Sequence, residues 1–529
     1  MTSSPISPPR RSFFRTIAPF LIIGIGAAVI IGVWTLPLEN LDKLQRVLTT
    51  NLTILLGVLL LAAWMIFLSG WTMWVRMGVL VCAAVVIMGS VKKVTFTGDM
   101  RPVFQYRWEN PIAHLEEQRA NQKHLEKSAA EIAPSVGDYA EYRGVKRDGV
   151  VAGPALAREW KTPPRELWRQ PVGGGFAGFV VQGSVAVTIE QRRDREAIVC
   201  YDTATGTEIW AFSYPADFQE AMGGPGPRAT PTIAGDEVFS LGAVGDLVCL
   251  DLKTGKKKWN VNVLADNTNI IWAMSGSPLV YENMVVVNPG AQKSEAQGKA
   301  LRAYDRSNGK LIWASGDTKA GYSSPMLATL AGKQQILLFD ADCVAGYDPK
   351  TGTRLWKKDW PGYNGVNVAQ PLVLGDDRLF ISRSYDVGAG AVIKISEKDG
   401  KWEFSEPPIW ENKYLRCKFT SPVLYQDHIY GLDEGILVCL DAKTGKRKWR
   451  GGRYGHGQIL LTGDLILVLA EDGKLVLVQA TPEAHRELGS IRALPGDKTW
   501  NHLALARGVA YLRNHEEMVA YELPLAEKK

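Results

Sequence analysis

A short motif that recurs every 40–54 residues constrains the fold of this chain more than any other feature. From about residue 165 on, a small and an apolar residue precede Asp, Gly follows four positions later, and Trp follows after four more. The clear copies have their Asp at five positions: Asp202, Asp251, Asp305, Asp348 and Asp441. Degenerate copies lie near Ser396 and Thr481, and a last copy begins at Ala520-Tyr521-Glu522. Repeats of this length indicate a propeller, a solenoid or an array.

The segments between the motifs favour the propeller. They contain short apolar runs such as residues 335–339 and 465–469, and turn residues such as Gly463-Asp464 bound them. No helical period lies between these runs, and four strands per repeat make a propeller blade. Counting all copies, the sequence predicts an all-β domain with eight blades.

The motif itself has a structural explanation. Asp starts a tight turn and accepts hydrogen bonds from backbone N–H groups two residues on, and Gly adopts the positive φ that other residues avoid. Trp then lies over the neighbouring blade and buries about 150–250 Å². We therefore expect the repeated Asp, Gly and Trp residues to be structural rather than catalytic.

The ends of the repeat predict how the ring closes. The eighth unit ends after its third strand, near residues 521–525. A strand with its own Trp, residues 166–169, stands at the start of the repeat region. We expect this N-terminal strand to complete the C-terminal blade, which leaves no free edge between the first and last blades.

Residues 1–93 have a different composition. Stretches without charge run over residues 16–38, 47–75 and 77–91, and about 20 apolar residues suffice to cross a bilayer. We predict three transmembrane helices over residues 17–36, 51–69 and 72–91. A cleaved signal peptide is the alternative, because residues 10–15 resemble a twin-arginine signal, but the long first stretch and the two that follow favour an anchor.

Charge counting leaves the orientation open. Three arginines before the first span favour a cytoplasmic N-terminus, which would put the C-terminal part outside the cytoplasm. Counted over all flanks, however, four basic residues fall on each side. We divide the chain into a cytoplasmic tail (1–15), three transmembrane helices (16–92), a helical stalk and lead-in segment (93–164) and the propeller (165–529). Within the stalk, residues 111–133 read as a solvated helix.

The Asp-x-x-Thr-Gly-x-x-x-Trp repeat resembles the repeat of PQQ-type propellers over residues 165–525. That family includes quinoprotein dehydrogenases and the non-enzymatic outer-membrane assembly lipoproteins of the BamB type. The lead-in residues Tyr142–Gly149 and the loop Gly223–Arg228 also resemble membrane-anchored bacterial PQQ-like proteins. The resemblance implies a PQQ-type propeller; an enzyme of this family would use PQQ with calcium.

Several features of quinoprotein enzymes are missing from the sequence. Many alcohol-oxidising members carry adjacent cysteines near the cofactor, whereas this chain has six cysteines and no Cys-Cys pair. Cys200, Cys249 and Cys439 share one repeat position, which indicates small buried residues. The repeat is also close in length to a compact blade. We interpret the loop carboxylates Asp340, Asp342 and Asp386 as turn and surface residues, and we assign no catalytic or metal-binding residue.

One constellation of the repeat predicts a binding site. The innermost strands begin near Thr230-Pro231, Ser277-Pro278, Ser324-Pro325, Gln370-Pro371 and Ser421-Pro422, so the residues just before them should ring one mouth of the central channel. The candidate ligand-binding residues are Arg228, Trp272, Tyr322, Asn367, Lys418, His456 and Trp500. Their aromatic and basic side chains suit a planar or anionic ligand, such as PQQ or an acidic peptide loop.

These observations favour a non-catalytic binding and scaffolding platform on the periplasmic side of the bacterial inner membrane, with the lipid bilayer and an envelope protein or peptide as partners. A PQQ-dependent dehydrogenase that oxidises an alcohol or sugar and reduces membrane quinone is the alternative. A sensor is a third option, but no signalling domain supports it. A net charge of +6 without a long basic tract does not indicate nucleic-acid binding.

Overall fold

The computed structural model describes ten parts of the chain: residues 13–36, 43–96, 100, 102–108, 131–220, 223–264, 271–291, 300–385, 388–496 and 498–527. They fall into two compact units. The first comprises Met1–Asn110 with Glu220–Gly224, and the second comprises Pro111–Gln219 with Pro225–Lys529. The predicted stalk helix lies largely outside the described residues, whose next segment opens at residue 131 with turns.

The first unit contains three helices, α1 (Phe13–Thr35), α2 (Lys43–Phe67) and α3 (Met73–Ser90). All three are long and apolar enough to cross a membrane. The prediction of three such helices is confirmed, but α2 starts at Lys43 rather than at residue 51. A hairpin of β1 (Val91–Phe96) and β2 (Pro102–Tyr106) follows α3, and the sequence analysis did not predict it.

Two arginines explain how basic residues fit into these apolar helices. The Arg46 guanidinium donates a hydrogen bond of 2.7 Å to the carbonyl of Val33, near the end of α1. Arg76 donates to the carbonyls of Ile66 and Trp71, at the junction between α2 and α3. Because carbonyls near a helix end lack partners within the helix, each arginine satisfies backbone groups while it joins two helices.

The second unit is built of eight antiparallel sheets. The first four blades comprise β4 (Val180–Gln182), β5 (Val185–Arg192), β6 (Arg195–Asp202) and β7 (Glu208–Pro215); β10 (Thr232–Ala234), β11 (Glu237–Leu241), β12 (Asp246–Asp251) and β13 (Lys257–Asn262); β14 (Leu279–Tyr281), β15 (Met284–Val287), β16 (Leu301–Asp305) and β17 (Leu311–Ser315); and β18 (Met326–Leu330), β19 (Lys333–Phe339), β20 (Cys343–Tyr347) and β21 (Arg354–Asp359).

The remaining four blades complete the ring. They comprise β22 (Leu372–Val373), β23 (Arg378–Ser382), β24 (Gly390–Lys398), β25 (Lys401–Phe404) and β26 (Trp410–Asn412); β27 (Val423–Tyr425), β28 (His428–Asp433), β29 (Ile436–Asp441) and β30 (Arg447–Arg453); β31 (Gln458–Thr462), β32 (Leu465–Leu469), β33 (Lys474–Gln479) and β34 (Glu487–Arg492); and β35 (Ala504–Ala506), β36 (Val509–Arg513), β37 (Glu517–Glu522) and β3 (Arg165–Pro171). Short elements in loops are β8 (Gln219–Glu220), β9 (Gly224–Pro225) and the 3-10 turn Tyr363–Gly365.

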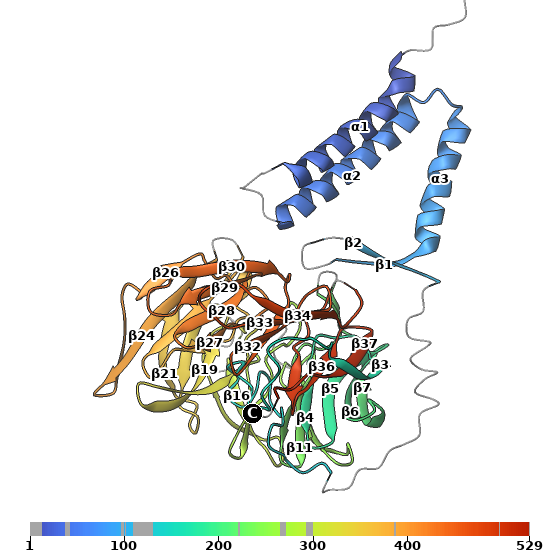
Figure 1. Cartoon of the computed structure of the whole chain (residues 1–529). Coiled ribbons are helices and arrows are strands. Elements are labelled where there is room, and N and C mark those ends of the chain that lie inside the picture. The colour runs from blue at the N-terminus through green and yellow to red at the C-terminus, as the bar shows by residue number, and fades with distance from the viewer. Residues whose placement is uncertain are drawn as a thin grey trace, which may run out of the picture. The chain divides into compact units, whose positions relative to one another are not determined.

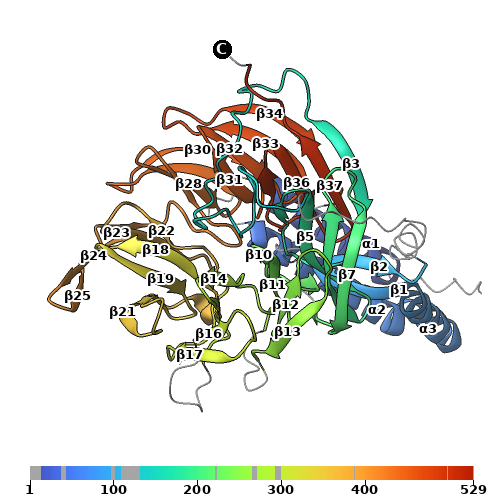
Figure 2. The ribbon, with the colours of Figure 1, turned by 90° about the horizontal axis from the view of Figure 1, so that it is seen from below.

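The first strand of each blade lies innermost. Figure 1 marks each strand's place in the sequence by its colour, and Figure 2 shows β10, β14 and β31 toward the centre of the propeller and β7, β13 and β17 at its periphery. Innermost strands of neighbouring blades contact one another, as β4 does with β10 and with β35. The buried apolar residues form clusters between adjacent blades. The core is therefore a ring of blade-to-blade contacts, as the repeat predicts.

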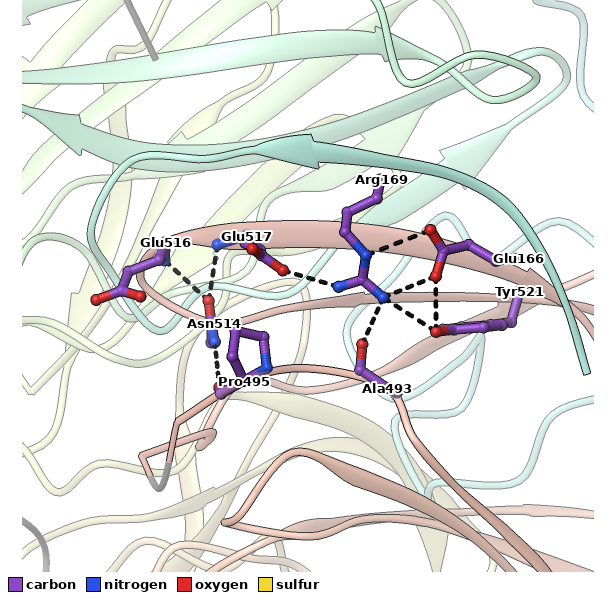
Figure 3. Close-up of polar contacts among 8 residues, drawn as sticks. All are labelled: Glu166, Arg169, Ala493, Pro495, Asn514, Glu516, Glu517 and Tyr521. Atoms are coloured by element: carbon purple, nitrogen blue, oxygen red, sulfur yellow. Dashed lines mark hydrogen bonds and ion pairs between the residues drawn. The ribbon is translucent and has the colours of Figure 1, made fainter. Parts of the chain in front are cut away.

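The predicted closure is confirmed. Strand β3 pairs antiparallel with β37, so the N-terminal strand is the outer strand of the eighth blade. Figure 3 shows the contacts of Arg169, which donates hydrogen bonds to Glu166, Glu517 and the phenol oxygen of Tyr521. Its guanidinium also donates to the carbonyl of Ala493 in the loop after the seventh blade. One side chain thus joins both ends of the propeller to the preceding blade.

The motif residues take the expected structural roles. In the turns that begin at Asp202, Asp251, Asp348 and Asp441, the carboxylate accepts hydrogen bonds from the backbone N–H and the hydroxyl of the Thr three residues later. The motif glycines have φ between 66° and 72°. A Cβ at these glycines would come within 2.4–2.6 Å of a Trp ring of the preceding blade; the pairs are Gly206–Trp168, Gly255–Trp210, Gly309–Trp259, Gly352–Trp313 and Gly445–Trp410.

Candidate functional site

A belt of hydrogen bonds positions the mouth of the channel. At the start of the innermost strands, one backbone N–H donates to the equivalent side chain of the next blade. The bonds run from Gly178 to Thr230, Thr230 to Ser277, Ser277 to Ser324, Ser324 to Gln370 and Gln370 to Ser421, with lengths of 2.6–3.0 Å. This explains why Ser, Thr or Gln precedes Pro in these repeats: each oxygen satisfies a backbone donor of the neighbouring blade.

Between the last blades, two buried side-chain amides make the hydrogen bonds that join neighbouring blades. The Gln458 amide donates hydrogen bonds of 2.7 and 3.0 Å to the carbonyls of Phe419 and Trp500. The Asn501 amide donates to the carbonyls of Gly175 and Ala177, each at 3.0 Å. Gln458 therefore holds the backbone at Phe419 and Trp500 in place. Asn501 does the same for the loop around Phe176. This rigid support brings their rings together.

An aromatic cluster forms where these loops meet. The rings of Phe176 and Trp500 are stacked, with centroids 5.0 Å apart and an angle of 26°. Phe419 lies 4.6 Å from Trp500 and 5.2 Å from His456, and His515 meets Phe176 edge-on at 4.4 Å. We call these five residues the mouth cluster. Its rings come from four blades or their connecting loops, and each packs against another ring of the cluster.

Three cations flank the mouth cluster. The Arg228 guanidinium lies 5.5 Å from the ring centroid of Phe176, and Lys498 lies 4.7 Å from that of Trp500. Lys418, which is only 6% exposed, lies 5.8 Å from Phe419 and also faces Tyr385 at 4.8 Å. Cations at such distances are attracted to the ring faces. The cluster therefore combines packed aromatic rings with adjacent positive charge.

One carboxylate fixes the orientation of Trp500. The indole N–H of Trp500 donates a hydrogen bond of 2.8 Å to Oε1 of Glu471, and the backbone N–H of His456 donates to Oε2 at 3.1 Å. Glu471 is 7% exposed. Nearby, burial lowers the pKa of His515 well below its usual value, and Lys498 contributes in the same direction. At neutral pH, His515 therefore adds no positive charge to the mouth cluster.

The other predicted mouth residues lie elsewhere on the ring. Trp272 and Tyr322 form a tilted pair with centroids 5.8 Å apart, and both are half-buried. The Asn367 side chain is fully buried, and its amide donates to the carbonyls of Asp340, Ala341 and Trp360. Asn367 therefore pins loop backbone rather than presenting its amide at the mouth.

The structure thus joins four of the seven predicted residues, Arg228, Lys418, His456 and Trp500, to one aromatic cluster. Sequence reasoning did not single out Lys498, His515 or Glu471. Lys498 lies two positions before Trp500, and neither the alignment on the proline nor the residues taken from beside the aligned positions included it. His515 and Glu471 belong to loops at the ends of β36 and β32, which that alignment does not reach.

The loop carboxylates differ from one another. Asp342 is exposed, as expected, and Asp386 lies outside the described residues. Asp340, in contrast, is 1% exposed, so the interpretation as a surface residue is wrong. Its Oδ2 accepts a hydrogen bond of 2.7 Å from the Thr318 hydroxyl, and burial raises its pKa to about 8. Packing between the third and fourth blades, which local sequence does not reveal, buries this side chain.

The three repeat cysteines occupy buried packing positions. Cys200, Cys249 and Cys439 are all 0% exposed, as their shared repeat position predicts. All six cysteines are free thiols. Burial raises the pKa of Cys249 and of Cys439 to about 12, so neither is a thiolate at neutral pH. Their burial and protonation fit packing positions rather than nucleophiles.

The described residues do not fit PQQ with a calcium ion. Among them, no group of three or more His, Cys, Asp or Glu side chains is arranged to hold a metal ion, whereas calcium takes six to eight oxygen ligands. A planar quinone also needs an open aromatic face. In the mouth cluster, Trp500 is stacked on Phe176 and faces Lys498. We therefore derive no chemistry through this cofactor.

The sequence of this chain is similar to those of known proteins. Residues 162–271 and 223–451 match the sequence profile of a family described as "Outer membrane protein assembly factor BamB". The BamB of Shewanella oneidensis is 24% identical over 368 residues, which cover 60% of this chain and 89% of that protein. The dehydrogenase subunit of a quinone alcohol dehydrogenase from Gluconobacter oxydans is 24% identical over 278 residues, which cover 46% of this chain and 35% of that protein.

A solved structure supports the fold. The quinohemoprotein alcohol dehydrogenase of Comamonas testosteroni superimposes with a TM-score of 0.54 at 13% identity, over 79% of this chain and 85% of that chain. At this identity the likeness shows the propeller fold alone, because one fold supports many functions.

Proposed function

The chain belongs to the family of the outer membrane protein assembly factor BamB, and from this premise we propose that it is a membrane-anchored, non-catalytic binding and scaffolding platform of the cell envelope. The observation that carries the proposal is the mouth cluster, in which self-packed rings are flanked by Arg228, Lys418 and Lys498. Rigid aromatic anchors with adjacent cations are typical of protein-binding surfaces. The extent of the match adds support, because it covers almost all of a BamB but about a third of a dehydrogenase subunit.

The chemistry of the mouth cluster favours an acidic peptide segment as its ligand. Carboxylates form charge-assisted hydrogen bonds with Arg and Lys side chains, and apolar side chains of the same segment would cover the exposed edges of Phe419 and Trp500. Trp272 and Tyr322 form a second aromatic pair elsewhere on the ring. An envelope protein with an acidic loop meets these requirements. We also propose the division of the chain into a cytoplasmic tail, three transmembrane helices, a stalk and lead-in segment and the propeller, with boundaries after residues 15, 92 and 164.

The proposal places the propeller on the periplasmic side of the inner membrane. Three spans with residues 1–15 in the cytoplasm lead to this arrangement. Fusion of alkaline phosphatase or of green fluorescent protein to the C-terminus tests it, because the former is active only outside the cytoplasm and the latter fluoresces only inside. We expect an active phosphatase fusion. A fluorescent fusion without phosphatase activity contradicts the periplasmic location.

The alternative, a PQQ-dependent dehydrogenase, is tested with the purified full-length protein in detergent. The protein is incubated with PQQ and Ca²⁺, excess is removed, and bound chromophore and dye reduction with alcohols and sugars are measured. We expect neither stoichiometric binding nor turnover. Stoichiometric PQQ with substrate-dependent turnover would overthrow the non-catalytic proposal.

A photo-crosslinking amino acid at position 498 tests the platform directly in cells. Lys401, an exposed residue of β25, provides the control position. We expect position 498 to give discrete adducts with envelope proteins, and we expect these adducts to weaken when Lys418 is replaced by Ala. Equal adducts from positions 498 and 401, or none from either, would contradict a docking role for the mouth cluster.

A further inference from the structure

Residues 138–151, which we call the lead-in loop, lie against the innermost strands of the propeller. Tyr139 forms an antiparallel bridge with Val181 of the first blade, with N–O distances of 2.8 and 2.9 Å. The carbonyl of Ala140 accepts a bond from Ile233 of the second blade. Farther along the loop, the backbone of Leu461 in the seventh blade bonds with Gly149 and with Val151, each at 2.8 Å. The loop thus crosses the interior of the ring.

Arg147 binds four acceptors in the second, third and fourth blades. It is 1% exposed, and its Nη1 donates hydrogen bonds of 2.9 Å to the carbonyls of Ser277 and Pro325, in the third and fourth blades. Its Nη2 donates to the carbonyl of Pro278 and to the hydroxyl of Thr232, in the third and second blades. The same guanidinium pairs with Glu141 of the loop at 3.1 Å.

Arg143 has the same role on the other side of the ring. It is 0% exposed, and its Nη2 donates a bond of 2.7 Å to the carbonyl of Pro422. Its Nη1 lies 3.3 and 3.4 Å from the carbonyls of Ser421 and Ile459, in the sixth and seventh blades. Beside it, the phenol of Tyr142 bonds with Nε2 of His502, at the start of the eighth blade, at 3.0 Å. Together these contacts reach the first four and last three blades.

The chemistry of the innermost strands explains why arginine is used here. An innermost strand has one edge without a neighbouring strand, so its carbonyls face the channel without ladder partners. A guanidinium carries five N–H donors in a planar fork and can satisfy carbonyls of several strands at once. Lys, with a compact ammonium group, cannot span them in the same way.

The loop approaches from the end opposite the mouth cluster. Its backbone partners Val181, Ile233 and Leu461 each lie five residues beyond a mouth position, which corresponds to about 17 Å along an extended strand. The carbonyls that bind Arg143 and Arg147 lie two or three residues beyond such positions. The arginine side chains therefore point from the loop backbone toward the mouth.

We propose that the central channel is a docking site for the chain's own lead-in loop, and that this loop anchors the N-terminal segment to the propeller from inside the ring. The channel binds the loop through two arginines four residues apart, whose guanidinium groups donate hydrogen bonds to carbonyls at the innermost strands. The anchor is independent of what the mouth cluster binds.

A cut in the chain tests the anchor. A protease site is inserted between Ala152 and Gly153, which are exposed; a Cβ at Gly153 would meet nothing within 4 Å. The full-length protein is cleaved in detergent, and size-exclusion chromatography follows the fragment that ends at residue 152. We expect this fragment to stay bound to the propeller. Its separation from the propeller during the run would overturn the proposal.

Variants then locate the anchor. Replacement of both Arg143 and Arg147 by Ala should speed dissociation of the cut fragment on the order of a hundredfold, because each removes charged hydrogen bonds. The pair Arg143→Lys and Arg147→Lys should give a smaller loss, since charge remains without the fork. Lys146→Ala serves as the control, because it removes a positive charge from an exposed side chain of the same loop. Arginine variants that release the fragment no faster than Lys146→Ala would contradict the proposal.

Hydrogen exchange of the intact wild-type protein gives a readout that does not depend on any variant folding. The amides of Val151 and Leu461 should exchange as slowly as those of the blade strands, because both are bonded across the channel. Exchange of these amides at the rate of an exposed loop would show that the lead-in loop is not docked.

Discussion

The indole nitrogen of Trp168 donates a hydrogen bond of 2.8 Å to the carbonyl oxygen of Thr203. Trp168 lies on the N-terminal strand β3, which completes the eighth blade, whereas Thr203 lies in the motif turn of the first blade. The same type of bond joins Trp210 to Leu252 at 2.9 Å within the repeat. Because both bonds end one residue after the motif Asp, the closing junction of the ring is built like an internal junction.

Loss of Trp168 should open this junction. Trp168 is 7% exposed, and truncation of a buried Trp typically costs about 3–5 kcal/mol of unfolding free energy. We expect Trp168→Ala to lower the stability by that amount in chemical denaturation. Trp402→Ala, at a half-buried Trp of β25, is the matched control and should cost less. Equal losses from the two variants would contradict a special role of Trp168 in closure.

The motif glycines are required by the Trp rings as well as by backbone conformation. Gly255 has φ 66°, and its Cβ would lie 2.6 Å from the Trp210 ring; Gly463 has φ 58° with nothing within 4 Å. Ala at either position incurs about 1 kcal/mol of backbone strain. We expect Gly255→Ala to cost about 1–3 kcal/mol more than Gly463→Ala in the same denaturation assay, because the ring must move. Similar losses would mean that backbone strain alone requires the motif glycine.

The repeat made most of the ring predictable, and its failures have local causes. Eight units, the closure and the roles of Asp, Gly and Trp follow from turn chemistry and packing that recur in each blade. In the fifth blade, Ser396 lies inside the long strand β24, which pairs with both β25 and β26. The inter-blade Trp of this blade is therefore Trp410, beyond an inserted hairpin, and motif spacing could not locate it.

The lead-in loop was harder to predict for a different reason. Arg143 and Arg147 bind backbone carbonyls. Every residue has a backbone carbonyl, so residue types in the sequence do not reveal which carbonyls will accept these hydrogen bonds. The segment Tyr142–Gly149 that contains both arginines could be recognised as a motif, but its place inside the channel could not be predicted. The mouth cluster was predictable in part, since the residues before the innermost strands align on Pro, whereas Glu471 and His515 reach it from other loops.

Asp340 should make stability depend on pH. Burial raises its pKa to about 8, above the ordinary 3.8, so the folded protein binds a proton that the unfolded chain releases. Between these values the folded state is favoured at low pH, and stability falls as the pH rises toward the folded pKa. We expect Asp340→Asn, which keeps the contact with Thr318, to flatten this fall. The comparison is made by denaturation from pH 5 to pH 9, and parallel curves for both proteins would contradict it.

Glu166 should act in the opposite direction at acid pH. Its hydrogen bond from Arg169 lowers its pKa below the ordinary 4.5, with the Tyr521 phenol contributing in the same direction. The ionised form therefore stabilises the closure above that value, and the contribution is lost as the pH falls through the lowered pKa. We expect the stability advantage over Glu166→Gln to be present at pH 7 and to vanish at strongly acid pH. Glu411→Gln, at an exposed residue of β26, controls for charge removal and should show no such trend.

The cations of the mouth cluster should each contribute to binding of an acidic peptide. A fluorescent peptide rich in Glu and containing one aromatic residue is titrated against the full-length protein at low and at physiological salt. We expect Lys498→Ala to weaken binding about fivefold at low salt, since a solvent-accessible ion pair is worth up to about 1 kcal/mol. Lys418→Ala should weaken binding by at least as much, because Lys418 is 6% exposed and its charge is screened less by solvent. Screening should reduce this difference at physiological salt. Lys401→Ala should bind like the wild type, because Lys401 lies on the outer strand β25. If Lys401→Ala weakens binding as much as the mouth variants, the attraction arises from the overall charge of the protein and not from the mouth cluster.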